Sequence, residues 1–288
     1  MSVGRLRRRN WMSALLDGKS VAITGAGSGL GRAYAVACAA HGARVTVNDV
    51  DADAVHETCE AIVRSGGAAT PHVGSVASWE AARELVVLAS GRGGLDGLVA
   101  NAAINHHELP WLDTEETIRR TMEVNILGVQ FVGVHAMRAM LDAGGSVVTV
   151  TSGARFGIPR MSTYGASKGA VSAMTSSWAI DGRPYGIRVN AVSPLAHTRM
   201  SAADDRPDRP ALATPDRIAP LIVALLGDGS AGVTGQTFRF DGDELSVYKD
   251  PGLRVLSPRA DDGGPCPHED ALLDCLRLPG WMPRGVTA

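Results

Sequence analysis

Short runs of β-branched residues alternate with longer helical stretches along most of this sequence, beginning at Lys19. The expected strands are Ser20–Thr24, Arg44–Asn48, Gly97–Ala100, Ser146–Thr151, Arg188–Val192 and Thr237–Phe240. The expected helices are Leu30–Ala40, Ala52–Arg64, Trp79–Gly91, Glu115–Leu141, Tyr164–Ile180 and Pro215–Leu226. Strands that alternate with helices form βαβ units, because two parallel strands need a crossover connection. The pattern therefore predicts an α/β fold with a single doubly wound parallel sheet and helices on both faces.

Composition divides the chain into three regions. Residues 1–15 form a basic arm that is expected to be flexible, and its apolar run is too short for a secretory signal. Residues 16–244 carry the alternating pattern, and 45% hydrophobic residues in a chain of 288 are enough for a sizeable core. Residues 245–288 have the Pro and Gly content of loops, with one short helix expected at His268–Arg277. We expect this extension to pack on the domain; the alternative is that it borders the active site or reaches a neighbouring subunit.

Charge and cysteine content argue against several classes of protein. The 28 Lys and Arg residues nearly balance the 30 Asp and Glu residues, so the chain lacks the basic field of a nucleic-acid-binding protein. The 4 cysteines form no CxxC pair and are expected to be free thiols of a reducing compartment. Apolar runs such as Leu221–Leu226 are far shorter than the roughly 18–20 residues that a membrane span needs. We expect a cytoplasmic protein with no nucleic acid, membrane or metal partner.

A glycine-rich turn follows the first expected strand and opens the first helix. Its glycines fit the spacing G-x-x-x-G-x-G through Gly25, Gly29 and Gly31, not the G-x-G-x-x-G dinucleotide spacing. Glycine permits a tight turn and a close backbone approach, and a helix N-terminus supplies free N–H groups for a pyrophosphate. The residues expected to contact it are Gly25, Gly27, Ser28, Gly29, Leu30 and Gly31. The alternative is a turn that is glycine-rich for packing alone.

Asp49 lies at the end of the second expected strand, 24 positions after Gly25. A carboxylate there accepts a hydrogen bond from the 2′-hydroxyl of an adenosine ribose and repels a 2′-phosphate. The position therefore favours NAD over NADP as cofactor. The alternative, a cap for the following helix, suits Asp51 better. The loop pattern of nucleotide triphosphatases is absent from the sequence.

Tyr164 and Lys168 are four residues apart in an expected helix, so their side chains share a face. The pair is informative because the chain has only three lysines, Lys19, Lys168 and Lys249. A phenol is a poor base at neutral pH, and a neighbouring ammonium favours its phenolate form. The spacing therefore predicts an acid–base pair, against the alternative of an ordinary helix-surface pair.

Two further polar residues stand at informative places. Ser152 ends a strand, and a strand-end hydroxyl faces the crevice in which doubly wound sheets bind ligands. Asn125 lies inside a long amphipathic helix, where asparagine has poor propensity and needs a compensating interaction. For Asn125 a catalytic role and a buried structural role are equally open.

Together these features resemble the short-chain dehydrogenase/reductase family over roughly residues 16–242. The matching motifs are Thr24–Gly31, Ala100-Asn101-Ala102-Ala103, Asn125, Ser152, Tyr164-x-x-x-Lys168 and Arg188–Pro194. The resemblance implies a Rossmann-type fold and an NAD-dependent oxidoreductase that interconverts a secondary alcohol and a ketone. It also implies a homodimer or homotetramer built from the helices Glu115–Leu141 and Tyr164–Ile180.

The resemblance assigns roles to individual residues. Tyr164 would exchange the proton with the substrate oxygen, and Ser152 would donate a hydrogen bond to that oxygen. Lys168 would hold the nicotinamide ribose and lower the pKa of Tyr164, while Asn125 would position a water. The remaining residues implied to contact the cofactor are Ser75, Val76, Asn101, Ala102, Pro194 and Thr198.

The chain departs from the family pattern at several positions. The usual Asn-Asn-Ala-Gly reads Ala100-Asn101-Ala102-Ala103, the aspartate after the third strand is Ser75, and the usual Pro-Gly is Pro194-Leu195. Because of the first change, a cyclase or isomerase without net redox chemistry stays open, as does a nucleotide-sensing binding protein. His106 and His107 are expected to be solvated loop residues rather than substrate contacts.

Overall fold

The computed structural model describes residues 14–91, 93–197 and 212–248. The expected arm lies almost wholly outside these residues, as do Thr198 and the expected helix His268–Arg277. Residues 249–288, most of the expected extension, also lie outside the described residues. Within the described residues, no helix has the length and apolar character needed to cross a bilayer.

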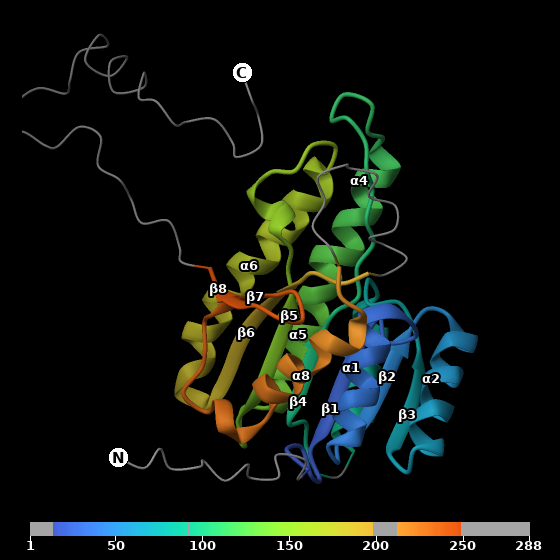
Figure 1. Cartoon of the computed structure of the whole chain (residues 1–288), viewed down its shortest axis with the longest axis vertical. Helices are drawn as coiled ribbons and strands as arrows, with labels where there is room; N and C mark the ends of the chain where they lie inside the picture. Colours follow the sequence, from blue (N-terminus) through green and yellow to red (C-terminus); the bar gives the residue numbers. More distant parts are fainter. Residues whose placement is uncertain (1–13, 92, 198–211, 249–288) are drawn as a thin grey trace, which may run out of the picture. The chain divides into compact units, whose positions relative to one another are not determined.

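One sheet runs through the domain in the order β3-β2-β1-β4-β5-β6-β7-β8 (Figure 1). The strands are β1 (Ser20–Thr24), β2 (Arg44–Asp49), β3 (Ala68–Val73), β4 (Gly97–Ala100), β5 (Gly145–Val150), β6 (Ile187–Pro194), β7 (Thr237–Phe240) and β8 (Leu245–Val247). All neighbours pair in parallel except β8, which is antiparallel to β7. The order reverses between β1 and β4, which confirms the doubly wound α/β fold.

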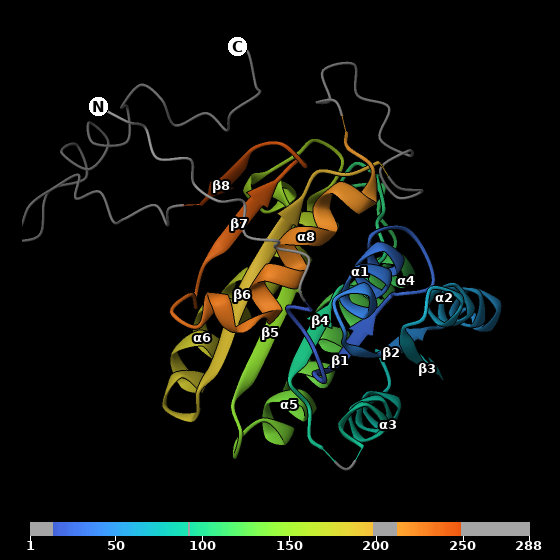
Figure 2. The same ribbon diagram turned by 60° about the horizontal axis from the view of Figure 1, so that its bottom comes forward.

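Helices cover both faces of the sheet (Figure 2). They are α1 (Gly29–Ala40), α2 (Ala52–Arg64), α3 (Trp79–Ser90), α4 (Glu115–Met122), α5 (Gly128–Ala139), α6 (Ser162–Gly182) and α8 (Pro215–Leu226). One apolar cluster joins α1, α2 and α8 to the sheet. A second cluster joins α3, α5 and α6 to the opposite face. The central strands are consequently buried on both sides, which explains their nearly continuous apolar sequences.

All six expected strands of the sheet and five of the six helices expected between them are present, with small shifts at their ends. The prediction omitted β3 and β8. β3 is an edge strand next to β2 only, and its sequence AATPHV contains Pro71, which an edge tolerates and a central strand does not. β8 lies inside the region 245–288 that was expected to be an extension, so the sheet continues past the expected boundary.

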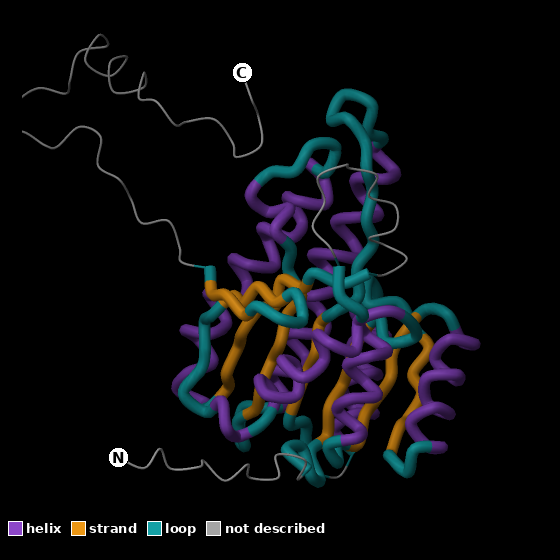
Figure 3. The backbone as a smooth tube through the Cα atoms, viewed as in Figure 1, coloured by secondary structure: helices purple, strands orange, loops and turns teal. Residues whose placement is uncertain are grey.

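The long expected helix Glu115–Leu141 is interrupted. Residues Glu123–Leu127 form a π-helical turn between α4 and α5, and Asn125 lies at its centre. Such turns are rare and occur frequently at functional sites. Figure 3 shows that the loops after β4 and β5 extend away from the sheet at the carboxyl ends of the strands.

Candidate active site

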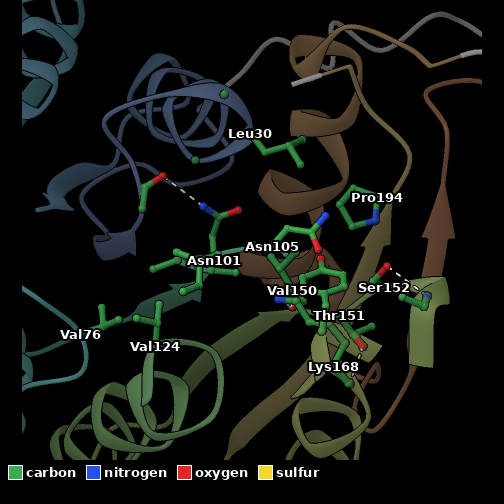
Figure 4. A pocket seen from close by; sticks show the side chains of 18 of the residues that line it. Leu30, Val76, Asn101, Asn105, Val124, Val150, Thr151, Ser152, Lys168 and Pro194 are labelled. Atoms are coloured by element: carbon green, nitrogen blue, oxygen red, sulfur yellow. Dashed lines mark hydrogen bonds between the residues drawn. The ribbon is translucent and has the colours of Figure 1, made fainter. Parts of the chain in front are cut away.

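A cavity of about 1070 Å³ opens at the carboxyl ends of the parallel strands. It lies at the reversal of strand order between β1 and β4, where doubly wound sheets bind ligands. Its walls come from the turn after β1, the end of β2, the loops after β3, β4, β5 and β6, the segment from α4 into the π-helical turn, and the first turns of α6. Figure 4 shows Leu30, Asn101, Ser152 and Lys168 around the space.

The glycine turn has the backbone geometry that its sequence predicts. Gly25 and Gly29 have φ values of 63° and 54°, a region that side chains with a Cβ rarely adopt. A Cβ at Gly31 would collide with the carbonyl oxygen of Gly25. α1 begins at Gly29, so its free N–H groups and partial positive charge face the cavity. The turn can therefore hold an anionic group such as a pyrophosphate.

Asn101 fastens the glycine turn to the end of β4. Its Nδ2 donates to the carbonyl oxygens of Thr24 and Gly25 at 3.0 and 3.1 Å. The Thr24 hydroxyl in turn accepts from the backbone N–H groups of Asn101 and Ala102. These bonds preorganise the cradle without help from a ligand. The two alanines that replace residues of the family pattern fit their places. Ala100 is buried in the core, and Ala103 lines the cavity.

Asp49 lies on the cavity wall at the end of β2. Its Oδ2 accepts from the N–H of Gly27 at 3.0 Å, and its Oδ1 accepts from the N–H of Val50 at 2.8 Å. Oδ1 also accepts from the N–H of Asp51 at 3.4 Å, so these bonds fix the carboxylate at the end of the glycine turn and leave Oδ2 with a further lone pair. The fixed carboxylate can accept from a ribose hydroxyl.

Tyr164 and Ser152 meet on the opposite wall, from the first turn of α6 and the end of β5. Tyr164 is 8% exposed. Burial raises the pKa of its phenol to about 12, and a hydrogen bond with the Ser152 side chain acts in the opposite direction. The phenol is therefore protonated at neutral pH in the absence of a ligand and is ready to donate a proton.

Lys168 lies one helical turn beyond Tyr164 and is 2% exposed. Its Nζ donates to the carbonyl oxygen of Val150 at 2.8 Å and lies 5.6 Å from the centre of the Tyr164 ring. Burial lowers the pKa of the amine to about 8. Desolvation is the largest influence on the pKa of both groups, so the pKa of the phenol lies above its usual value and the pKa of the amine lies below its usual value.

Asn125 is fully buried and has its side chain engaged. Its Oδ1 accepts from the N–H of Ile104 at 2.8 Å, and its Nδ2 donates to the carbonyl oxygen of Ile104 and to Ser167 Oγ. The asparagine thus ties the loop after β4 to α6, three residues past Tyr164. This is the structural role that the sequence left open, and it does not test the catalytic one.

The structure brings most of the expected site residues to this one cavity. Those that line it are Gly25, Ser28, Gly29, Leu30, Gly31, Asp49, Ser75, Val76, Asn101, Ala102, Ser152, Tyr164, Lys168 and Pro194. Gly27 and Asn125 do not line it, but Gly27 is hydrogen-bonded to Asp49 and Asn125 to Ile104, and both of these partners do line it. Thr198 lies outside the described residues.

Sequence reasoning missed several residues on the wall. The apolar ones include Ile104, Ile158 and Met161, and the polar and charged ones include Asn105, His107, Glu116, Arg119, Arg120 and Glu123. His107 was expected to be a solvated loop residue; it is half-buried on the cavity wall, so contact with the substrate, the other alternative for this residue, stays open. His106 fits the expectation better, since it does not line the cavity and is partly exposed. No motif marks this loop; only its position after a strand that ends at the cavity could have indicated it.

Several known proteins are similar to this chain in sequence or in structure. The family model described as enoyl-(acyl carrier protein) reductase matches residues 25–242. An uncharacterized oxidoreductase of Thermotoga maritima is 42% identical over 180 residues, which are 62% of this chain and 71% of the relative. The 2,5-dichloro-2,5-cyclohexadiene-1,4-diol dehydrogenase of Sphingobium indicum is 35% identical over 251 residues, 81% of this chain and 99% of the relative. A crystal structure of a short chain dehydrogenase from Mycobacterium avium has a TM-score of 0.79 at 30% identity, covering 91% of this chain and 95% of that one.

Proposed function

This chain belongs to the short-chain dehydrogenase/reductase family, whose dehydrogenases use nicotinamide cofactors, and we propose that it interconverts a secondary alcohol and a ketone with NAD. The observation that carries the proposal is the joint presence of Tyr164, Ser152 and Lys168 in the cavity that also contains the glycine turn. A pure binding protein needs no buried phenol and amine of this kind. The relative from Sphingobium indicum is named as a dehydrogenase of a cyclic diol, which supports an alcohol substrate.

The residues present fit a dinucleotide. The glycine turn and the N-terminus of α1 would hold the pyrophosphate, Asp49 the adenosine ribose and Lys168 the second ribose. When bound, the nicotinamide supplies or accepts the hydride. The chain itself would position the cofactor and the substrate and provide a path for the proton.

That proton path begins at Tyr164. In ketone reduction its protonated phenol donates to the carbonyl oxygen as the carbon is reduced, and Ser152 orients that oxygen by a hydrogen bond. In alcohol oxidation the phenolate accepts the same proton. Ile158, Met161 and Leu195 supply an apolar wall against which the carbon skeleton of the substrate packs.

The test of the proposed function is direct. Purified full-length protein is incubated with NAD and a panel of secondary alcohols, and the absorbance of reduced nicotinamide is followed. We expect turnover with at least one alcohol and tight binding of NAD by calorimetry. Tight binding of NAD without oxidation of any alcohol or reduction of any ketone would favour a cyclase or isomerase that uses Tyr164 and Ser152 for acid–base work alone.

Asp49 provides a test of cofactor choice. Replacing it by serine removes the charge that would repel a 2′-phosphate, so we expect the ratio of kcat/KM for NADP to that for NAD to rise about tenfold or more. Dissociation constants of both dinucleotides, measured by calorimetry, should move in the same direction. Asp51→Ser is the matched control, because Asp51 caps α2 by accepting from Ala54 and does not line the cavity. A wild type that already prefers NADP would contradict the assignment.

A further inference from the structure

The loop between β4 and α4 is joined to α6 immediately beside Tyr164. It begins on the cavity wall, which its residues 101–105 and 107 line. Its last part contains Asp113, which does not line the cavity and whose side chain is 3% exposed. A buried carboxylate needs partners, because removing a charge from water is costly. The partners of Asp113 therefore indicate what this residue does.

Both oxygens of the Asp113 carboxylate are engaged. Oδ2 accepts from the hydroxyl of Thr163 at 2.5 Å, a distance typical of a bond from a hydroxyl to a charged oxygen. Oδ1 accepts from the N–H of Thr114 at 3.0 Å and lies 3.5 Å from Nε2 of His106. Thr163 is itself buried. The bond between Asp113 and Thr163 is thus shielded from water, which strengthens it relative to a bond at the surface.

α6 begins without a cap of its own. The residue before its first turn is Met161, whose side chain makes no capping hydrogen bond, and the first turn contains no acidic residue. A helix N-terminus has free N–H groups and a partial positive charge, which a nearby carboxylate stabilises. Asp113 brings that charge from a position 50 residues earlier in the chain and bonds the residue that directly precedes Tyr164. A contact from outside the helix therefore orients the turn that carries the phenol.

A second group of bonds holds the other side of Tyr164. The Ser167 hydroxyl donates to the carbonyl oxygen of Tyr164 at 2.7 Å and accepts from Asn125 Nδ2 at 3.0 Å. Asn125 also bonds both backbone groups of Ile104, near the start of the same loop. Asp113 and Asn125 therefore connect the two ends of the loop to residues before and after Tyr164.

The segment that leads into α6 is joined to the loop through its backbone. The N–H of Glu108 donates to the carbonyl oxygen of Arg160 at 2.8 Å, and Glu108 forms a parallel bridge with Met161. Arg160 has a φ of 63°, a region that residues with a Cβ rarely adopt. Such a conformation persists only where the surrounding contacts impose it. The approach to Tyr164 is thus kept in one conformation by the loop.

We propose that Asp113 is a positioning residue for the reaction, which sets the place of the Tyr164 phenol relative to the substrate oxygen through its bond to Thr163. The inference rests on the proposed function, in which Tyr164 transfers the proton. A displacement of a reacting group by about 1 Å is costly, because proton transfer requires hydrogen-bond distances. Loss of the bond should act on the chemical step and spare dinucleotide binding, since Asn101 holds that cradle by separate bonds (Figure 4).

The first test is kinetic and uses one alcohol–ketone pair. Asp113→Ala should lower kcat about tenfold and leave the dissociation constant of NAD within about threefold. Thr163→Val removes the partner hydroxyl with little change of shape and should cause a similar loss. The double variant should lose about as much as either single variant, because both remove the same bond. Thr163→Ser keeps the hydroxyl and should retain the wild-type kcat.

Asp96→Ala is the matched control. The Asp96 carboxylate accepts from the N–H of Ser20 at 2.8 Å, which also joins distant parts of the chain, but at the amino ends of the strands and away from the cavity. This variant should unfold at lower urea concentration and keep the wild-type kcat. An equal loss of kcat in Asp96→Ala and Asp113→Ala would show that activity follows stability alone and would overturn the inference.

Hydrogen exchange separates this inference from the proposed function, because it needs no turnover. In full-length protein with NAD, the amides of residues 104–112 and 158–168 should exchange about tenfold faster in Asp113→Ala and in Thr163→Val than in the wild type or Asp96→Ala. This result in a protein that oxidises no alcohol would support the positioning of Tyr164 and contradict the proposed function. Unchanged exchange, or an unchanged kcat in both variants, overturns the inference and leaves the proposed oxidoreductase intact.

Discussion

Replacing Tyr164 by phenylalanine is expected to lower kcat by about 10²–10⁴-fold in both directions, which is the usual contribution of a positioned proton donor. The affinity for the dinucleotide should change little, because the ring and the packing around it remain. The measurement is steady-state turnover of one alcohol–ketone pair, together with calorimetry of NAD binding. Retained turnover would show that another group moves the proton.

Tyr34→Phe is the matched control for this experiment. Tyr34 belongs to α1 and is fully buried in the core, and its hydroxyl has no partner among the described residues. Burial raises the pKa of this phenol strongly, and the residue does not line the cavity. Removing its hydroxyl should leave kcat unchanged and raise the free energy of unfolding slightly, since an unsatisfied polar group is lost. Loss of the hydroxyl thus should lower turnover at Tyr164, whereas at Tyr34 it should leave turnover unchanged and raise stability.

The pH dependence follows from the same phenol. Burial raises the pKa of Tyr164 to about 12, so the form that donates a proton predominates at neutral pH. Alcohol oxidation needs the phenolate, and its kcat/KM should therefore rise as pH increases toward that pKa. Ketone reduction needs the phenol and should not rise over the same range. Coincident profiles in the two directions would argue against Tyr164 as the titrating group.

The fold and the glycine turn could be predicted because each depends on steric and burial constraints that act on a few neighbouring residues. Only glycine can occupy positions such as Gly31, where a Cβ would strike the backbone, so the turn is visible in the sequence. Strands buried on both faces, such as β1, β5 and β6, carry nearly continuous apolar or β-branched runs, which makes them visible in the sequence. β3 and β8 were missed because an edge strand such as β3, exposed on one side, carries no such run.

The substrate side of the site could not be predicted for a different reason. Asn105 and His107 reach the cavity through the path of one loop, and the contacts of Asp113 with Thr163 that fix this path join residues 50 positions apart. No spacing rule encodes such contacts. The effect of burial on the pKa values of Tyr164 and Lys168 is likewise a property of the packed structure, whereas the sequence shows only that the two groups are neighbours.

Lys168 is expected to combine a large contribution to activity with a cost to stability. Its amine is 2% exposed and donates to the carbonyl oxygen of Val150, and burial lowers its pKa to about 8. Lys168→Met should lower kcat/KM about 10²-fold or more, because the cation beside the phenol is lost. Lys168→Arg should be nearly as damaging, since a broad planar group replaces a compact ammonium in a closed space.

Stability should move in the opposite direction in the Lys168→Met variant. A folded-state pKa below that of the unfolded chain means that the unfolded state binds more protons between about pH 8 and pH 10, so wild-type stability rises with pH through this window. Below this window the net cost of keeping the buried amine charged is about 3 kcal/mol, with the bond to Val150 already included. The variant should therefore unfold at higher urea concentration than the wild type near pH 7, and this advantage should shrink as pH approaches 10.

Lys19→Met, which removes an ion pair with Asp228 at 2.8 Å, should show neither the loss of activity nor the gain in stability. Equal tolerance of replacement at Lys19 and Lys168 would contradict the role assigned to Lys168.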